Sequence, residues 1–376
     1  MTTTDPTPPT TADAAPAVTT TTEPAAVDTD KLMAFVFRAV DEVGAALNTA
    51  LVVMGDRLGY YRLMAAHGPV TATRLADASD TSEHYAREWL NAQAAGGYVT
   101  YDPATRTYTL PPEQAVALTD ATSPVYLPGF FQIAHGTVRD APRVIDAART
   151  GDGVGWHEHN DDVHTGCERF FRPGYHAHLV AEWLPALEGV VDRLRAGARV
   201  ADVGCGHGAS TILMASAFPA SSFTGSDYHE ASVETARDRA GEAGVGDRVR
   251  FETAAATAFS GGPFDLVTTF DALHDMGDPI GAARHVRDML RDDGAWMIVE
   301  PVAGDAVEDN FNPVGRAYYG FSTLLCTPSS LAQDVGMALG TQAGPARIRD
   351  VVTTAGFSRF RIAAQTPFNN VFEVRR

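Results

Sequence analysis

A short glycine-rich stretch between two apolar runs constrains the fold of this chain most strongly. Residues 198–204 read ARVADVG, an apolar run that ends in glycine, as buried parallel strands do. The sequence continues through GCGHG, the helix-like STILMASAF and a second strand-like run, SSFTGSDY. Strand, glycine loop, helix and strand together predict a parallel α/β unit.

The glycine loop and the residue that ends the second strand point to a bound ligand. Gly204, Gly206 and Gly208 lack a Cβ, so they permit a tight turn and a close approach of backbone to ligand. Asp227 can accept hydrogen bonds from both hydroxyls of a ribose. The loop is G-x-G-x-G rather than the dinucleotide pattern G-x-G-x-x-G, and Asp202 would repel a pyrophosphate. Asp202 instead suits a cationic end, such as the amino group of a methionine moiety.

The stretch ADVGCGHG, followed by a strand that ends in Asp227, resembles motif I and the acidic residue of class I S-adenosylmethionine-dependent methyltransferases. The resemblance implies S-adenosyl-L-methionine as cofactor, with the glycines on its methionine part, Asp202 near its amino group and Asp227 on its ribose. Many relatives hold the adenine with an acid after the third strand, whereas this chain has Ala255, Ala256 and Thr257 there. That contact must come from backbone or a neighbour. We expect cofactor contacts from Asp202, Gly204, Gly206, Gly208, Asp227, Tyr228, Ala255, Ala256 and Asp271.

The remaining patterns complete a doubly wound, Rossmann-like sheet of seven strands. RVRFETAA, PFDLVTTFDAL and AWMIVEP are strand-like, and RFRIAAQTP and NNVFEVRR predict a C-terminal antiparallel pair. DPIGAARHVRDMLRDDG predicts a helix that ends at Gly294. The fold class is therefore α/β, with an all-α and winged-helix region before the sheet.

The N-terminal half divides into three regions. Residues 1–28 contain almost no large apolar side chains and predict a disordered tail. Residues 29–115 predict helices, then a helix-turn-helix and a hairpin, which is a winged helix serving dimerisation. Residues 116–196 predict a helical linker that contributes to a substrate pocket, and residues 197–376 predict the S-adenosylmethionine-binding methyltransferase domain.

The charge of the winged helix argues against DNA binding. Residues 70–110 carry three arginines against five acidic residues, whereas a DNA-binding face is basic. The apolar helices of residues 30–67 need a partner instead, and a second copy of the chain is a natural one. We therefore expect a homodimer through the N-terminal domain.

The order of the domains and two stretches narrow the resemblance to dimeric small-molecule O-methyltransferases. The order of winged helix, linker and sheet is similar to theirs, LHDMGDP resembles their LHDWSD, and QAGPARIRDVVTTAGFSRFRI resembles the helix and strand that close their sheet. The resemblance implies O-methylation of a small, aromatic or enolic metabolite, with the histidine of LHDMGDP as general base.

His274 and Asp271 follow a parallel strand at its carboxyl end, where ligands bind in open α/β sheets. A base within reach of a phenol or enol removes its proton as the methyl group is transferred, and histidine has a suitable pKa. Glu300 ends the next strand and is our first choice to orient the ring. Asp275 and Glu308 are alternatives.

Aromatic and polar residues of the linker and of a late insertion are the candidates for acceptor contacts, although core packing would explain them equally well. A metal ion at His274 and Asp275 would need a further ligand from the linker, such as His157, His159 or His164, and we expect none. A metal-assisted C-methyltransferase or a non-catalytic, S-adenosylmethionine-sensing regulator are alternative functions. The candidate acceptor contacts are Trp156, Phe170, Phe171, Tyr175, Asn312, Tyr318 and Tyr319.

Composition excludes several other classes of protein. A formal net charge of −18 disfavours nucleic acid and anionic membranes as partners. No apolar run is long enough to span a bilayer, and the first residues lack the pattern of a secretory signal. Three cysteines, far apart and odd in number, predict no disulfide framework. The expected location is the cytoplasm.

Overall fold

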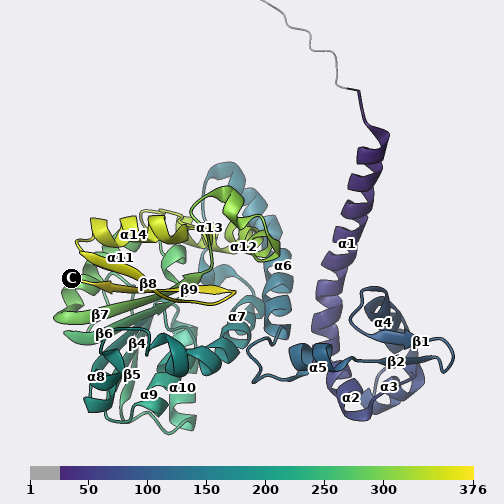
Figure 1. Cartoon of the computed structure of the whole chain (residues 1–376), viewed down its shortest axis with the longest axis horizontal. Coiled ribbons are helices and arrows are strands. Elements are labelled where there is room, and N and C mark those ends of the chain that lie inside the picture. The colour runs from purple at the N-terminus through teal and green to yellow at the C-terminus, as the bar shows by residue number, and fades with distance from the viewer. Residues whose placement is uncertain (1–25) are drawn as a thin grey trace, which may run out of the picture. The chain divides into compact units, whose positions relative to one another are not determined.

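The computed structural model describes residues 26–376, so most of the predicted tail lies outside the described residues (Figure 1). The chain divides into two compact units at Gly44, each considered by itself. The first unit contains the N-terminal part of helix α1 (Thr29–Arg57). Its apolar side chains are exposed in this chain, including Phe35, Phe37, Val40 and Val43.

The second unit begins with a helix-turn-helix and a hairpin, as the sequence predicts. Thr71 caps α3 by accepting a hydrogen bond from the backbone N–H of Arg74 at 3.2 Å. The core of this region forms around Trp89, whose ring meets those of Tyr60 and Tyr61 edge to face at 4.9 and 5.1 Å. The elements are α2 (Tyr60–His67), α3 (Ala72–Ser79), α4 (Glu83–Ala95), β1 (Thr100–Asp102), β2 (Thr107–Thr109) and α5 (Pro112–Thr119).

The linker is helical, as predicted, and includes a π-helical segment. π-helical turns are rare and often occur at functional sites. The elements are α6 (Pro128–Thr150), η1 (Trp156–Glu158), α7 (Asp161–Gly174), the π-helix η2 (Tyr175–Trp183) and α8 (Val190–Ala196).

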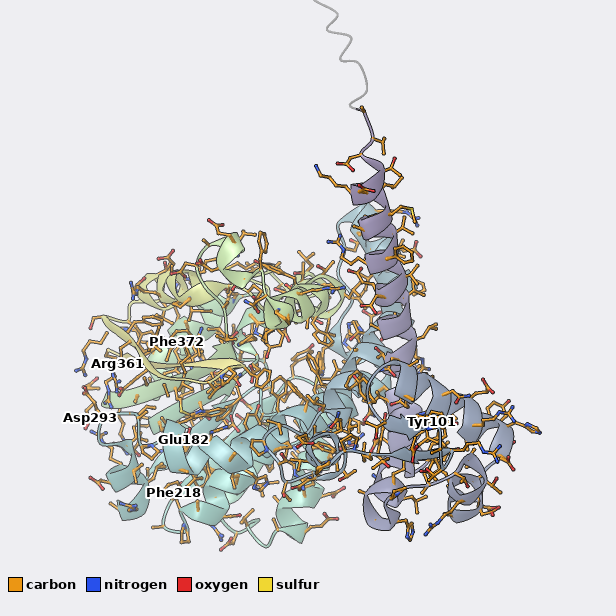
Figure 2. All side chains as sticks on the ribbon, turned by 45° about the vertical axis from the view of Figure 1, so that its right-hand side comes forward. Tyr101, Glu182, Phe218, Asp293, Arg361 and Phe372 are labelled. Atoms are coloured by element: carbon orange, nitrogen blue, oxygen red, sulfur yellow. The ribbon has the colours of Figure 1, made fainter. Side chains whose placement is uncertain are left out.

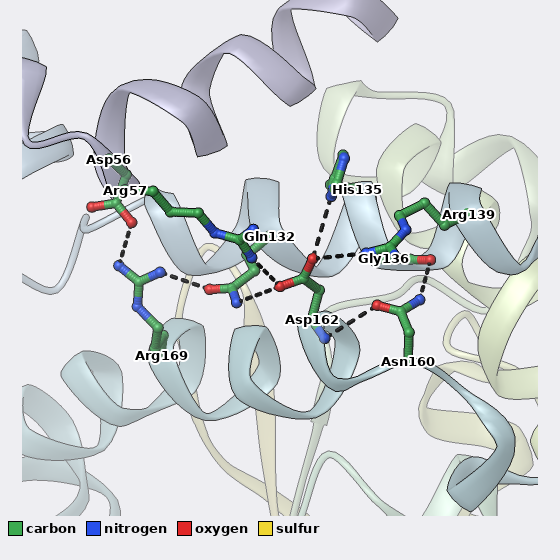
Figure 3. Close-up of polar contacts among 9 residues, drawn as sticks. All are labelled: Asp56, Arg57, Gln132, His135, Gly136, Arg139, Asn160, Asp162 and Arg169. Carbon is green, nitrogen blue, oxygen red and sulfur yellow. Dashed lines mark hydrogen bonds and ion pairs between the residues drawn. The ribbon is translucent and has the colours of Figure 1, made fainter. Parts of the chain in front are cut away.

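A polar network joins the end of α1 to α6 and α7 (Figure 3). Its centre is the buried carboxylate of Asp162, which accepts from Gln132 at 2.9 Å and forms ion pairs with Arg57 and Arg139. Arg169, two turns further along α7, donates to Gln132 at 2.6 Å and to Asp56 at 2.7 Å. The network therefore fixes α7 to the last turn of α1.

Seven strands form the predicted sheet, in the order β5-β4-β3-β6-β7-β9-β8. The first five in this order are parallel, and β9 is antiparallel to both β7 and β8. The strands are β3 (Arg199–Val203), β4 (Ser222–Asp227), β5 (Val249–Thr253), β6 (Phe264–Phe270), β7 (Leu290–Pro301), β8 (Arg359–Gln365) and β9 (Asn369–Arg375).

Two hydrophobic cores lie on opposite faces of the sheet, because side chains alternate along each strand. On β7, Met297 and Val299 enter the core formed with α9 (Ala209–Ala217), α10 (Glu230–Glu242) and η2. Trp296 and Ile298 enter the core formed with α11 (Pro279–Met289) and α14 (Gly344–Thr354). Figure 2 labels one member of each core, Phe218 and Phe372.

The predicted end of the helix at Gly294 is wrong. Helix α11 ends at Met289, and β7 begins at Leu290, which is buried and pairs with Phe264. A shift in the β6–β7 register accommodates the next residues, and Asp292 and Asp293 are exposed there. These polar residues look like the surface of a continuing helix, so the sequence pattern does not mark the boundary. The boundary follows instead from the burial of Leu290 and its pairing with Phe264.

The segments between β6 and α11 and between β7 and α14 shape the site described below. They comprise η3 (Leu273–Asp275), η4 (Val307–Asn310), α12 (Pro313–Phe321), the π-helix η5 (Ser322–Cys326) and α13 (Thr327–Leu331). Across residues 26–376, no helix is long and apolar enough to cross a membrane.

Candidate active site

A cavity of about 710 Å³ lies at the carboxyl ends of the parallel strands, between the sheet, the linker and the segment from α12 to α13. This is the position where open α/β sheets bind ligands. The cavity brings together the glycine loop after β3, the end of β4, the residues after β6, and aromatic side chains of α6 and α7.

The glycine loop has a backbone that other residues would not tolerate. Gly204 and Gly208 have φ angles of 76° and 78°. A Cβ at Gly204 would lie 2.8 Å from that of Ala272, and one at Gly208 would lie 2.8 Å from the ring of Phe251. At Gly206, by contrast, a Cβ would meet nothing within 4 Å, and this residue lines the cavity. The loop therefore presents bare backbone to a ligand.

Asp227 is fixed beside this loop. Its Oδ2 atom accepts from the backbone N–H of Gly206 and its Oδ1 atom from that of His229, both at 2.9 Å. Each oxygen keeps a lone pair, so the carboxylate can still accept hydrogen bonds from a ribose. Burial raises its pKa from 3.8. Tyr228, Ala255, Ala256 and Asp271, which we predicted as cofactor contacts, line the same cavity as the loop.

Asp202 is not where the sequence predicts it. It is buried behind the loop, outside the cavity lining, and accepts from the hydroxyls of Ser210 at 2.7 Å, Thr211 at 2.6 Å and Thr268 at 2.9 Å. These hydroxyls satisfy the carboxylate and join α9 to the sheet. Gly208 also lies outside the lining and serves the turn.

His274 lines the cavity, and Glu300 lies behind it as predicted. Glu300 Oε2 is 2.5 Å from His274 Nδ1, and Glu300 Oε1 accepts from the backbone N–H of Leu273 at 3.0 Å. Burial opposes a charge on the ring, but the carboxylates of Glu300 and Asp275 outweigh it, so the pKa of His274 lies well above 6.5. The ring is therefore oriented through Nδ1, and Nε2 faces the other way.

Two neighbours of Nε2 complete a cluster. Asp275 Oδ1 is 3.2 Å from Nε2, and Cys326 Sγ, at the end of η5, lies within 4.8 Å of the donor atoms of both residues. Such a set could hold a metal ion, although the linker histidines do not take part in it. Burial, followed by the charge of Asp275, raises the pKa of the Cys326 thiol to about 12, so the thiol keeps its proton. The sequence did not indicate Cys326, because 52 residues separate it from His274.

Asp271 has an unusual backbone, with a φ angle of 48°. Its Oδ1 atom accepts from the side-chain amide of Asn369 at 2.9 Å, whereas Oδ2 is buried without a hydrogen-bond donor. Burial, with a further contribution from Glu300, raises its pKa well above 3.8. Strained residues of this kind often mark functional sites.

Aromatic side chains form the wall on the linker side. The rings of Phe130 and Phe170 stack at 4.6 Å. The predicted residues Trp156, Phe170, Phe171, Tyr175 and Tyr318 line the cavity, but Asn312 and Tyr319 do not. Asn312 instead caps α12 by accepting from the N–H of Gly315 at 2.9 Å. The sequence did not predict several other lining residues, because no local pattern marked them: Phe130, Ile133, Cys167, Phe321, Leu325, Gln333 and Val335.

Two of the linker histidines are not on the surface. His159 is buried, with Nδ1 3.1 Å from Asp140 Oδ2. His164 lines the cavity and stacks on His229 at 5.1 Å. Burial, followed by the nearby His229, lowers the pKa of His164 to about 4, so it is uncharged at neutral pH.

Gln333 ties the loop after α13 to the segment that carries His274. Its amide nitrogen donates to the carbonyl of Asp275 at 2.8 Å, and its oxygen accepts from the N–H of Gly277 at 3.1 Å. Ser330 donates to the carbonyl of Met276 at 2.8 Å. Gln333 and Ser330 thus hold the backbone that follows His274.

The sheet, the glycine loop and the N-terminal helices define a protein that joins a winged helix-turn-helix domain to a methyltransferase domain. Residues 45–120 match the model of the Rv2258c-like winged HTH domain, and residues 201–296 match that of a methyltransferase domain.

Individual proteins match part of the sequence or the fold. The 27-O-demethylrifamycin SV methyltransferase of Amycolatopsis mediterranei is 42% identical over 131 residues, which cover 33% of this chain and 48% of the relative. The chain thus spans about half the length of the curated relatives it matches. In its fold it is similar to the mitomycin 7-O-methyltransferase MmcR, with a TM-score of 0.66 and 19% identity, over 93% of this chain and 100% of the other. It is also similar to human N-acetylserotonin methyltransferase in complex with S-adenosylmethionine, with a TM-score of 0.65 and 17% identity, over 94% of this chain and 99% of the other.

Proposed function

We propose that this chain is an S-adenosylmethionine-dependent O-methyltransferase that acts on a small aromatic or enolic metabolite. One observation carries the proposal: a buried, carboxylate-oriented histidine faces the same cavity as the glycine loop and Asp227. The matched methyltransferase domain and the names of the relatives support it. The alternatives of a metal-assisted C-methyltransferase and of a regulator are not favoured by any of these relatives.

The glycine loop and Asp227 would hold the cofactor. S-adenosylmethionine supplies a sulfonium-bound methyl group that a nucleophile can displace. The backbone at Gly204 and Gly206 would accommodate its methionine part, and Asp227 would accept from its ribose hydroxyls. The aromatic wall would exclude water and align the acceptor, which lowers the barrier of an in-line displacement.

His274 would take the proton of the acceptor hydroxyl. Glu300 holds Nδ1, so Nε2 is the atom that would take the proton, and the acceptor hydroxyl would approach it beside Asp275, whose Oδ1 lies 3.2 Å from Nε2. Because the pKa of His274 is raised, the resting ring carries a proton that must leave before Nε2 can act as a base. As the O–H proton moves to Nε2, the acceptor oxygen would bond to the methyl carbon, and the sulfur would keep the electrons of the broken carbon–sulfur bond.

A homodimer through the N-terminal domain also belongs to this proposal. Within the first unit, large apolar side chains of α1 are exposed, with Phe37 68% and Val40 62% accessible. A face with several exposed large apolar side chains commonly marks a protein interface. The double substitution Phe37→Glu and Val40→Glu should turn a dimer into a monomer in sedimentation velocity. A wild-type chain that is monomeric throughout would refute the dimer. The cytoplasm remains the predicted location.

A methyl-transfer screen tests the function. Purified chain, S-adenosylmethionine with a radiolabelled methyl group and a panel of phenols, enols and amines would be incubated, and labelled products separated. We expect label on oxygen of at least one aromatic hydroxyl compound. Calorimetry with S-adenosylhomocysteine serves as the parallel measurement of cofactor binding. A chain that binds no cofactor would overturn the proposal, and label found on carbon or nitrogen would correct the acceptor atom.

A further inference from the structure

The walls of the cavity carry acidic groups without basic counterparts. Among the described residues that line it, there is no lysine or arginine. This imbalance matters because a charge in a cavity of low dielectric interacts strongly with its surroundings. The lining carboxyl groups belong to Glu168, Asp227, Asp271, Asp275, Asp278 and Asp334.

Three of these carboxylates already have partners. Glu168 forms ion pairs with Arg239 at 3.2 Å and Arg172 at 3.4 Å. Asp278 caps α11 by accepting from the N–H of Gly281 at 2.7 Å. Asp227 accepts from the backbone of the glycine loop. These three therefore contribute little to the choice of acceptor.

The other three are less well compensated. Asp271 Oδ2 is buried and accepts no hydrogen bond. Asp275 Oδ1 lies 3.2 Å from His274 Nε2, but Glu300 lies 2.5 Å from the same ring, so one imidazole faces two carboxylates. Asp334, on the loop after α13, is exposed and pairs with no cation among the described residues. A negative group on a ligand would add to this uncompensated charge.

The histidines of the cavity do not compensate for these acids. A positive charge on His274 is balanced by Glu300 at 2.5 Å. Burial lowers the pKa of His164 and His207, so both rings are uncharged at neutral pH. An anionic substituent would also hold the proton on His274 more tightly and so oppose its action as a base.

We propose that this cavity selects acceptors without an anionic group, namely neutral or cationic aromatic or enolic hydroxyl compounds, and that Asp334 contributes to this selection at its edge. The inference rests on the proposed methyl transfer and adds the charge class of the substrate. Phenols that carry a carboxylate, sulfonate or phosphate are excluded by the same argument.

Three hydroxyindoles provide a matched test. Serotonin is cationic, N-acetylserotonin is neutral and 5-hydroxyindole-3-acetate is anionic, whereas the ring and its hydroxyl are the same. A second pair, 2-naphthol and 6-hydroxy-2-naphthoate, repeats the comparison on another ring. Binding would be measured by calorimetry with S-adenosylhomocysteine present, and turnover with radiolabelled S-adenosylmethionine. We expect neutral and cationic members to bind at least about tenfold more tightly than the anionic ones.

Charge reversal at the edge sharpens the test. Asp334→Lys should narrow the difference in binding affinity between neutral and anionic members at least about threefold, because it places a cation beside the anionic substituent. Glu113→Lys, which changes the same charge on α5 of the winged helix, should leave the difference unchanged. Circular dichroism would confirm that both variants are folded.

Each outcome has a definite meaning. Equal or tighter binding of the anionic members would overturn the charge preference, while methyl transfer itself could stand. If Asp334→Lys leaves the difference in affinity between neutral and anionic compounds unchanged, Asp334 does not contribute to the selection. If the cofactor binds but no panel member binds or is methylated, the proposed function fails and the charge preference fails with it.

Discussion

The Nδ1 atom of His274 lies 2.5 Å from Oε2 of Glu300, at the carboxyl ends of two adjacent strands. The pairing of Phe270 with Val299 sets the β6–β7 register and so brings the following residues together. The other oxygen of Glu300 accepts from the backbone N–H of Leu273. One buried carboxylate therefore fixes both the imidazole ring and the backbone that carries it.

Removing the ring of His274 should abolish most of the activity without affecting the cofactor. We expect His274→Gln to lower kcat/KM by about 10²–10⁴-fold, the usual contribution of a general base. Binding of S-adenosylhomocysteine should stay within about twofold, because the glycine loop is intact. His178→Gln, which changes a histidine of η2 outside the cavity lining, is the control. Full turnover in His274→Gln would refute the assignment.

The activity should depend on pH through the proton on His274. The pKa of His274 is raised above 6.5, so kcat/KM should fall as the pH drops through this raised pKa and the ring becomes protonated. Asp275 is one cause of the raised pKa, so Asp275→Asn should lower it and move the acid limb to lower pH. A pH profile of both proteins checks the direction. An acid limb that stays in place or moves to higher pH would contradict this account.

Asp227 should govern cofactor affinity. Asp227→Ala removes the acceptor that we propose for the ribose and the partner of the Gly206 backbone. A lost hydrogen bond to a charged group costs about 1.5–3 kcal/mol, so we expect affinity to fall by about 10- to 100-fold in calorimetry. Asp238→Ala, which removes an exposed carboxylate of α10, is the control. Unchanged affinity in Asp227→Ala would rule out the cofactor assignment.

Gln333 should act as a positioning residue for the base. Gln333→Ala removes the hydrogen bonds to Asp275 and Gly277, so the segment around His274 should shift. We expect kcat to fall by about 10- to 100-fold, because small displacements in an active site are costly. Cofactor affinity should be unchanged. Gln333→Glu keeps an acceptor for Gly277 and should recover part of kcat, whereas equal losses in both variants would indicate a merely structural role.

Asp162 should stabilise the junction of α1, α6 and α7. Burial opposes its charge, but the hydrogen bond from Gln132 and the charge of Arg57 outweigh it, so its pKa lies below 3.8. A lowered pKa contributes stability above the ordinary pKa and loses it as the pH falls through the lowered value. Asp162→Asn should therefore lower the free energy of unfolding at pH 7 by about 1–3 kcal/mol, which a lower Tm would reveal.

The pH dependence distinguishes this network from a general packing effect. The gap in Tm between Asp162→Asn and the wild type should shrink as the pH falls below 3.8, where the native carboxylate becomes protonated. Asp161→Asn, an exposed neighbour in the same helix turn, should have a much smaller effect at pH 7. Equal losses for the two substitutions would argue against the network.

The sequence by itself determined the sheet, the glycine loop and the pair of residues at the strand ends. Apolar runs, glycines and the spacing to Asp227 are local features, and the sheet rule then places His274 and Glu300 at one edge. The tertiary structure alone decided which side of the loop Asp202 faces, because its partners Ser210, Thr211 and Thr268 come from a neighbouring helix and strand. It also brought Cys326 to His274, since contacts across 52 residues depend on how separate elements pack rather than on any local pattern.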